Sequence, residues 1–188
     1  GQIKKSALSD YENHRNNTKA IALLDEDELI QVTLTTGSQH IFIVTEQGLA
    51  VRMPEAVFRS QGKQTQGKGG IKLGKGDNVC ALLTIQPEDS RYILTLTRDG
   101  IGKRTLLSEY EPRGGKAKGV ITSKVNDEGS KLATAIIVDD TNEIIISSSC
   151  GKIVRTGCSD IRVSGRNTKG VKLINLGKEA YLTTASAV

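Results

Sequence analysis

A pattern that occurs four times along the 188 residues constrains the fold of this chain more than any other feature. Each copy begins with a glycine (Gly1, Gly48, Gly100 and Gly151), and ten residues later stands a large apolar or aromatic residue (Tyr11, Phe58, Tyr110 and Ile161). Units of about 40–50 residues that repeat in this way are typical of propeller blades, each of which buries an apolar face against its neighbour. We therefore predict an all-β, propeller-like array of four-stranded blades. Residues 1–188 form one repeat domain with approximate blades 1–47, 48–99, 100–150 and 151–188.

Alternation of apolar and polar residues predicts the strands within each unit, as in residues 30–34 and 94–97. The first strand follows the glycine; the second covers residues 20–24, 70–73, 119–124 and 170–174; the third covers 29–34, 79–85, 132–138 and 181–185; the fourth leads to the next glycine. No segment before Gly1 supplies an incoming strand. We therefore expect fifteen strands rather than sixteen, one incomplete sheet beside Gly1, and a chain that is a segment of a longer protein. The second unit is expected to carry about three extra residues in its loop, 60–70.

The composition fits such a fold. Aromatic residues make up only 3% and tryptophan is absent, so the core must come from Ile, Val and Leu, which suit strands. The three cysteines lack metal-ligand spacing, which indicates free thiols in a reducing compartment. No apolar stretch approaches the ~18 residues that a membrane helix needs. We expect a cytoplasmic protein without membrane association.

Basic residues are concentrated in four windows, 13–24, 59–75, 113–124 and 162–178, which hold sixteen of the 26 basic residues and none of the 21 acidic ones. Equivalent positions in a repeat array lie on one side of the assembly, so these windows predict a continuous basic rim. Such a rim suits the phosphates of duplex DNA, and the scarcity of aromatic residues argues against single-strand recognition. The residues predicted to contact DNA are Arg15, Lys19, Arg59, Lys63, Lys68, Lys72, Arg113, Lys116, Lys118, Lys124, Arg162, Arg166, Lys169 and Lys172.

The other candidate residues predict no catalytic or metal site. His14 and His40 have no cysteine or acidic partner at ligand spacing, so we expect them to be solvated. The hydroxyls of Tyr11 and Tyr110 are dispensable to the pattern, because Phe58 and Ile161 hold the same position; core packing is the expected role. Basic residues also flank the repeat glycines, where they either extend the rim or are solvated strand ends: Lys4, Lys5, Lys103, Arg104 and Arg155.

Residues 165–174 (G-R-N-T-K-G-V-K-L-I), 100–110 and 118–121 resemble blade motifs in the C-terminal domain of the DNA gyrase A protein, and the resemblance spans essentially the whole chain. It implies a β-pinwheel, a propeller-like ring whose blades exchange strands and around which duplex DNA wraps to support ATP-dependent supercoiling. It implies a non-catalytic accessory domain of a bacterial, nucleoid-associated type II topoisomerase. The implied partners are DNA, the N-terminal cleavage domain of the same polypeptide, and the ATPase subunit. No cofactor is expected in this chain, since ATP and Mg would act on other domains.

One departure leaves alternatives open. The gyrase box Q-R-R-G-G-K-G does not occur, and the nearest stretches are residues 113–119 and 64–70. The matching positions suggest later blades, with the first blades lying upstream. The corresponding domain of topoisomerase IV, with a degenerate box, is one alternative. A protein-interaction propeller is another, although it would need exposed aromatic hot spots that so few aromatic residues cannot readily supply.

Overall fold

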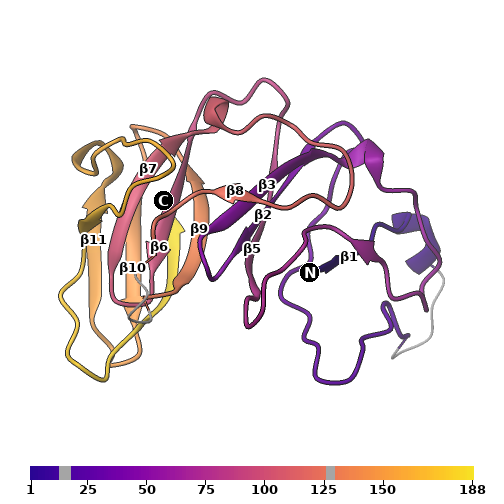
Figure 1. Ribbon diagram of the computed structural model, residues 1–188, viewed down its shortest axis with the longest axis horizontal. Helices are drawn as coiled ribbons and strands as arrows, with labels where there is room; N and C mark the ends of the chain where they lie inside the picture. Colours follow the sequence, from indigo (N-terminus) through magenta and orange to yellow (C-terminus); the bar gives the residue numbers. More distant parts are fainter. Residues whose placement is uncertain (13–17, 126–129) are drawn as a thin grey trace.

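The computed structural model describes residues 1–12, 18–125 and 130–188, and these residues form four antiparallel β-sheets placed side by side (Figure 1). Four short 3-10 elements are present: η1 (Leu8–Tyr11), η2 (Glu55–Val57), η3 (Leu107–Glu109) and η4 (Cys158–Asp160). The strands are β1 (Gln2–Ile3), β2 (His40–Thr45), β3 (Leu49–Pro54), β4 (Lys68–Gly69), β5 (Val79–Ile85), β6 (Tyr92–Thr97), β7 (Ile101–Leu106), β8 (Val120–Ile121), β9 (Leu132–Val138), β10 (Glu143–Ser148), β11 (Ile153–Gly157), β12 (Val171–Lys172) and β13 (Leu182–Ala187). No helix among the described residues is long and apolar enough to cross a bilayer.

Each full sheet combines strands from three successive units. The sheet orders are β5-β2-β3-β8 and β9-β6-β7-β12, followed by the three-stranded β11-β10-β13. The central hairpins, β2–β3, β6–β7 and β10–β11, turn at the repeat glycines and so join the end of one unit to the start of the next. The outermost short strands, β8 and β12, come from the unit that follows. Consecutive blades therefore exchange strands, and the predicted all-β, propeller-like fold class is confirmed.

The sheet beside Gly1 contains only β1 and β4, as expected, but it is not the one incomplete sheet that was predicted, because β11-β10-β13 also lacks a fourth strand among the described residues. Two strands predicted for the first unit, residues 20–24 and 29–34, are not strands, so the described residues contain thirteen strands rather than fifteen. In the other sheets, β5, β9 and β13 pair with the central strands β2, β6 and β10. In the first sheet the equivalent central strand would lie between β1 and residues 29–34, and no strand among the described residues occupies this position. Val32 and Leu34 are consequently 76% and 74% exposed, although their alternation is that of a half-buried strand.

The prediction of three extra residues in the second unit's loop is wrong. Gly67, Gly119 and Gly170 each precede a short strand that pairs with the start of the neighbouring first strand, through Lys68↔Ile3, Val120↔Ala50 and Val171↔Gly102. Each glycine therefore lies nine residues after the large residue of its unit, and the three loops have the same length. The glycines at positions 67, 69 and 70 made the alignment ambiguous, and strand pairing resolves it in favour of Gly67.

Three clusters of buried Ile, Val, Leu and Ala side chains form the core between and beside the sheets. Two aromatic residues join neighbouring units in this core, where the Phe42 and Tyr110 rings meet edge to face with centroids 4.9 Å apart. Such a pair contributes about 0.5–1.5 kcal/mol beyond its buried area. The core thus links neighbouring blades as well as filling each of them.

Replacing the hairpin glycine Gly100 with alanine is expected to lower the free energy of unfolding more than the same change at Gly151. Both have positive φ, 86° and 77°, a conformation that costs a residue with a Cβ about 1–2 kcal/mol. A Cβ at Gly100 would also lie 2.6 Å from the Ile174 carbonyl oxygen, whereas nothing lies within 4 Å at Gly151. Urea denaturation of both variants measures the difference; equal losses would contradict the close approach.

Candidate nucleic-acid interface

Three basic loops, residues 59–67, 111–119 and 162–170, follow η2, η3 and η4 and lie in an unbroken series. The segment that follows the second-unit loop meets the third-unit loop, where the Lys72 N–H donates to the Ala117 carbonyl at 3.0 Å and the Lys116 side chain covers Gly69. The segment that follows the third-unit loop contacts the fourth-unit loop, where the Lys124 N–H donates to the Thr168 carbonyl at 3.0 Å. The strand exchange between blades therefore connects each of these loops to the next through the segment that follows it.

Most of the residues predicted to contact DNA are exposed, and all of the exposed ones except Lys19 lie on these loops or on the segments that follow them. The exposed members are Lys19, Arg59, Lys68, Lys72, Arg113, Lys116, Lys118, Lys124, Arg162, Lys169 and Lys172. Lys63 and Arg166 are half-buried, and Arg15 lies outside the described residues. The Lys172 Nζ donates to the Asp99 carbonyl at 2.8 Å in the β6–β7 turn, so Lys172 lies at the far end of its blade from η4.

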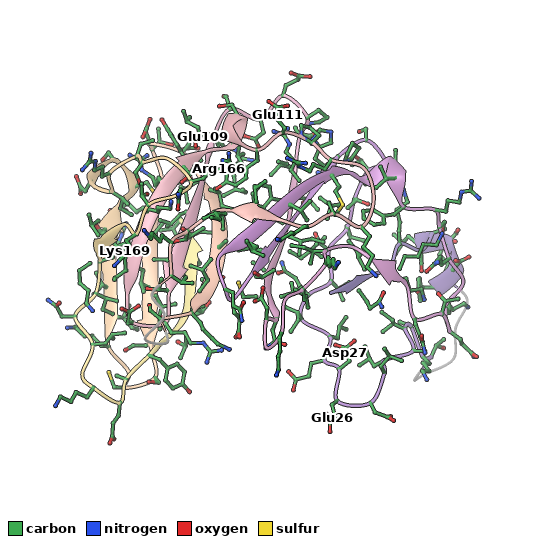
Figure 2. All side chains as sticks on the ribbon, viewed as in Figure 1. Glu26, Asp27, Glu109, Glu111, Arg166 and Lys169 are labelled. Carbon is green, nitrogen blue, oxygen red and sulfur yellow. The ribbon has the colours of Figure 1, made fainter. Side chains whose placement is uncertain are left out.

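Acidic groups are not wholly excluded from the neighbourhood of these loops. Glu26 and Asp27 lie at the lower edge of the view in Figure 2, away from Arg166, but Glu109 and Glu111 lie close to it. The Arg166 N–H donates to Glu109 Oε2 at 3.2 Å, and its Nε lies 3.9 Å from the same oxygen. Sequence windows drawn from Arg113 onward omitted these two carboxylates, because they stand just before that arginine on the chain.

The basic residues that flank the repeat glycines are mostly neither rim residues nor solvated strand ends. Lys103 and Arg104 are 1% and 3% exposed. The Arg104 Nε donates to the Ile161 carbonyl, and its NH1 forms an ion pair with Asp140. Lys5 pairs with Glu55 and Arg155 pairs with Glu143. Lys103 and Arg104 thus connect neighbouring blades, a role that only the packing of one unit against the next reveals, whereas Arg155 is a solvated strand end whose ion pair lies within one sheet.

His40 also differs from expectation, since it is half-buried and its Nδ1 accepts a hydrogen bond from Arg52 Nε at 3.0 Å. Burial and the neighbouring Arg52 charge lower the pKa of His40. His14 lies outside the described residues. Cys80, Cys150 and Cys158 are free thiols. Over residues 1–12, 18–125 and 130–188, no three His, Cys, Asp or Glu side chains gather as metal ligands would.

Sequence comparison places these features in a family. A family model described as DNA gyrase C-terminal domain, beta-propeller, matches residues 1–36, 39–86, 91–139 and 142–188. The chain is 39% identical over 180 residues to the DNA gyrase A protein of Escherichia coli, covering 95% of this chain and 20% of that protein. It is 33% identical over 189 residues to the DNA gyrase A protein of Staphylococcus aureus, covering 100% of this chain and 21% of that protein. The chain thus spans about a fifth of the length of these relatives.

Solved structures agree on the fold. The C-terminal domain of DNA topoisomerase IV superposes with a TM-score of 0.93 at 24% identity, covering 100% of this chain and 59% of that one. The DNA gyrase A C-terminal domain superposes with a TM-score of 0.82 at 24% identity, covering 89% of this chain and 57% of that one. The strand exchange, the four matched repeats and these relatives lead to one conclusion: the chain belongs to the DNA gyrase C-terminal domain family of β-propellers.

Proposed function

We propose that this chain binds duplex DNA through its phosphates and bends the duplex across the three basic loops. The observation that carries the proposal is the unbroken series of these loops, because each adds exposed lysines or arginines to one continuous surface. Phosphate contacts fix the position of a protein on DNA without reading its sequence. The loops offer no helix or two-stranded ribbon to enter a major groove, so little sequence preference is expected.

The wider role that we propose is that of an accessory domain in a bacterial type II topoisomerase. The relatives named above are DNA gyrase A proteins, and the chain spans about a fifth of their length, which supports a place in a larger enzyme. We infer that its partners there are a cleavage domain and an ATPase subunit. In such an assembly the bent duplex would be presented to catalytic residues outside this chain, and ATP and Mg would be used by other domains. We propose gyrase rather than topoisomerase IV as the parent enzyme, because relatives at 39% and 33% identity are DNA gyrase A proteins.

Steep salt dependence is the expected result when the chain is titrated against a duplex of about 40 base pairs. Every phosphate neutralised releases counterions, which gives a slope of about −0.9 in log K against log salt concentration. With six to ten phosphates contacted, affinity should fall by about 10³–10⁵ between 50 and 200 mM salt. Fluorescence anisotropy measures this, with single-stranded DNA of equal length as the weaker-binding control. A flat salt dependence would favour a protein-interaction propeller instead.

A further inference from the structure

A buried lysine holds the fourth-unit loop from beneath. Lys103 is the third residue after the repeat glycine Gly100, and its Nζ donates to the carbonyls of Gly165 at 2.7 Å and Arg166 at 2.6 Å. A third bond reaches Thr168 Oγ1 at 3.0 Å. The side chain comes from β7, in the third unit, so the previous unit fixes the shape of the loop. A buried ammonium group requires such partners, because an unpaired one is costly to desolvate.

A related arrangement supports the second-unit loop, with one loop carbonyl in place of two and the Ala20 carbonyl as the other partner of the lysine. Lys4 is the third residue after Gly1, and its Nζ donates to the Lys63 carbonyl of the second-unit loop at 2.5 Å. Thr65 Oγ1 donates to the Gly62 carbonyl at 2.9 Å, as Thr168 Oγ1 donates to the Gly165 carbonyl at 2.8 Å. In both loops the cation also lies over a tyrosine ring. Lys63 Nζ is 5.9 Å from the centre of the Tyr11 ring, and Arg166 Cζ is 5.7 Å from the centre of the Tyr110 ring.

The third-unit loop differs at each of these positions. Val51 stands where Lys103 stands in β7, Phe58 replaces the tyrosine, and Gly115 and Ala117 replace the loop cation and the threonine. Lysine, tyrosine and threonine are thus present together for two loops and absent together for the loop between them. Because the three residues occur together or not at all, we infer that they act together on the loop rather than independently.

Peptide geometry says what the buried lysine does to the outer face of the loop. The N–H and C=O of a trans peptide point in opposite directions. Since the Gly165 and Arg166 carbonyls point inward to Lys103, the N–H groups of the same peptides, on Arg166 and Asn167, point away from it. The Arg166 N–H already donates to the Glu109 carboxylate at 3.2 Å, so this outer edge binds an anion within the protein itself.

We propose that Lys103 is a positioning residue that preforms the fourth-unit loop for phosphate contact, and that Lys4 does the same for the second-unit loop. The proposal rests on the proposed binding of duplex DNA. In the second-unit and fourth-unit loops, the outward N–H groups and the cation are then oriented before DNA binds. The glycine-rich third-unit loop adapts to the stretch of DNA backbone between them. Ordering the loops before binding reduces the entropy that binding would otherwise cost.

The test compares Lys103→Met, which keeps the aliphatic stem and removes the donor, with Thr168→Val, an exposed change that removes the third partner. Lys103→Met is expected to weaken binding to a ~40-base-pair duplex about 10-fold, the equivalent of about 1.4 kcal/mol. Hydrogen exchange of the amides of residues 165–168 should become faster without DNA. Thr168→Val should shift both measurements in the same direction by less. Lys131→Met, which removes a lysine paired with Glu46 elsewhere, is the matched control and should change neither.

A pH series separates positioning from simple packing. Burial lowers the pKa of Lys103 to about 8, with Glu109 opposing and Arg166 adding to that shift. Above pH 8 the ammonium is lost, so the ratio of wild-type to Lys103→Met affinity should shrink toward one between pH 7 and 9.5. A ratio that stays constant would mean that only the stem matters and would overturn the proposal.

The outcomes remain distinguishable whatever the variants do. If Lys103→Met does not fold, Thr168→Val decides, and unchanged loop exchange in that variant overturns the proposal. If the wild-type chain fails to bind duplex DNA, the proposed function is wrong, while faster loop exchange in Lys103→Met would still establish that this lysine positions the loop.

Discussion

Replacing Lys68, Lys116 and Lys169 together with alanine is expected to abolish bending of a ~40-base-pair duplex while weak binding to straight DNA persists. Lys116 and Lys169 are exposed in the third-unit and fourth-unit loops, and Lys68 is exposed directly after the second-unit loop. Bending 20–30 base pairs by 40–90° costs on the order of 1–6 kcal/mol, which only contacts spread over several loops can offset. Fluorescence energy transfer between labels on the duplex ends measures the bend, and the ends should approach each other only on the wild-type chain.

The matched control removes the same charge elsewhere. Lys75, Lys152 and Lys178 are exposed in or beside the turns at the other end of the blades, where Lys152 Nζ donates to the Asn175 carbonyl at 2.9 Å. Alanine at these three positions should leave the bend intact. If both triple variants behave alike, net charge rather than the loop series governs binding.

Placing the sequence of residues 90–99 directly before Gly1 is expected to raise the free energy of unfolding by several kcal/mol. That segment contains β6, which forms a hairpin with β7 and a second ladder with β9. The equivalent place beside β1 is an apolar cleft of about 950 Å³, lined by Ile3, Leu29, Ile30, Val32 and Leu34 among others. Each large apolar side chain that the added strand buries contributes about 1.5–3 kcal/mol.

Two measurements test the added strand. Urea denaturation gives the gain in stability, and hydrogen exchange should show new protection of the amides of residues 29–34. In the control extension, serines replace the copies of Ile93, Leu94 and Leu96, which are buried in β6. That extension should add little. Equal stabilisation by both extensions would mean that the cleft does not accept a strand in this register.

The sequence alone was enough to predict the class of fold, because its period of about fifty residues and its alternating strands are local patterns. Strands β2, β5, β6, β7, β9 and β10 occur within the predicted segments. The failures were residues 70–73, where the strand is β4 at Lys68–Gly69, and residues 20–24 and 29–34, which are not strands. Residues 30–34 alternate, but no strand among the described residues pairs with them. A strand is stabilised by pairing and cross-strand contacts, so its sequence alone cannot make it form.

For the candidate site too, some features could be predicted from the sequence and others depend on long-range contacts. The positions and signs of the loop charges are properties of the sequence, and most of those side chains are exposed as expected. Long-range contacts determined three further features: the continuity of the loops, the closeness of Glu109 to Arg166, and the burial of Lys103 and Arg104. Lys103 and Lys4 each lie about sixty residues before the loops that they hold, and no local pattern distinguishes them from solvated lysines. The sequence by itself therefore determined the repeat, the strands and the charge, because these are local. Only the tertiary structure decided which lysines meet solvent and which support the loops, because that depends on how one blade packs against the next.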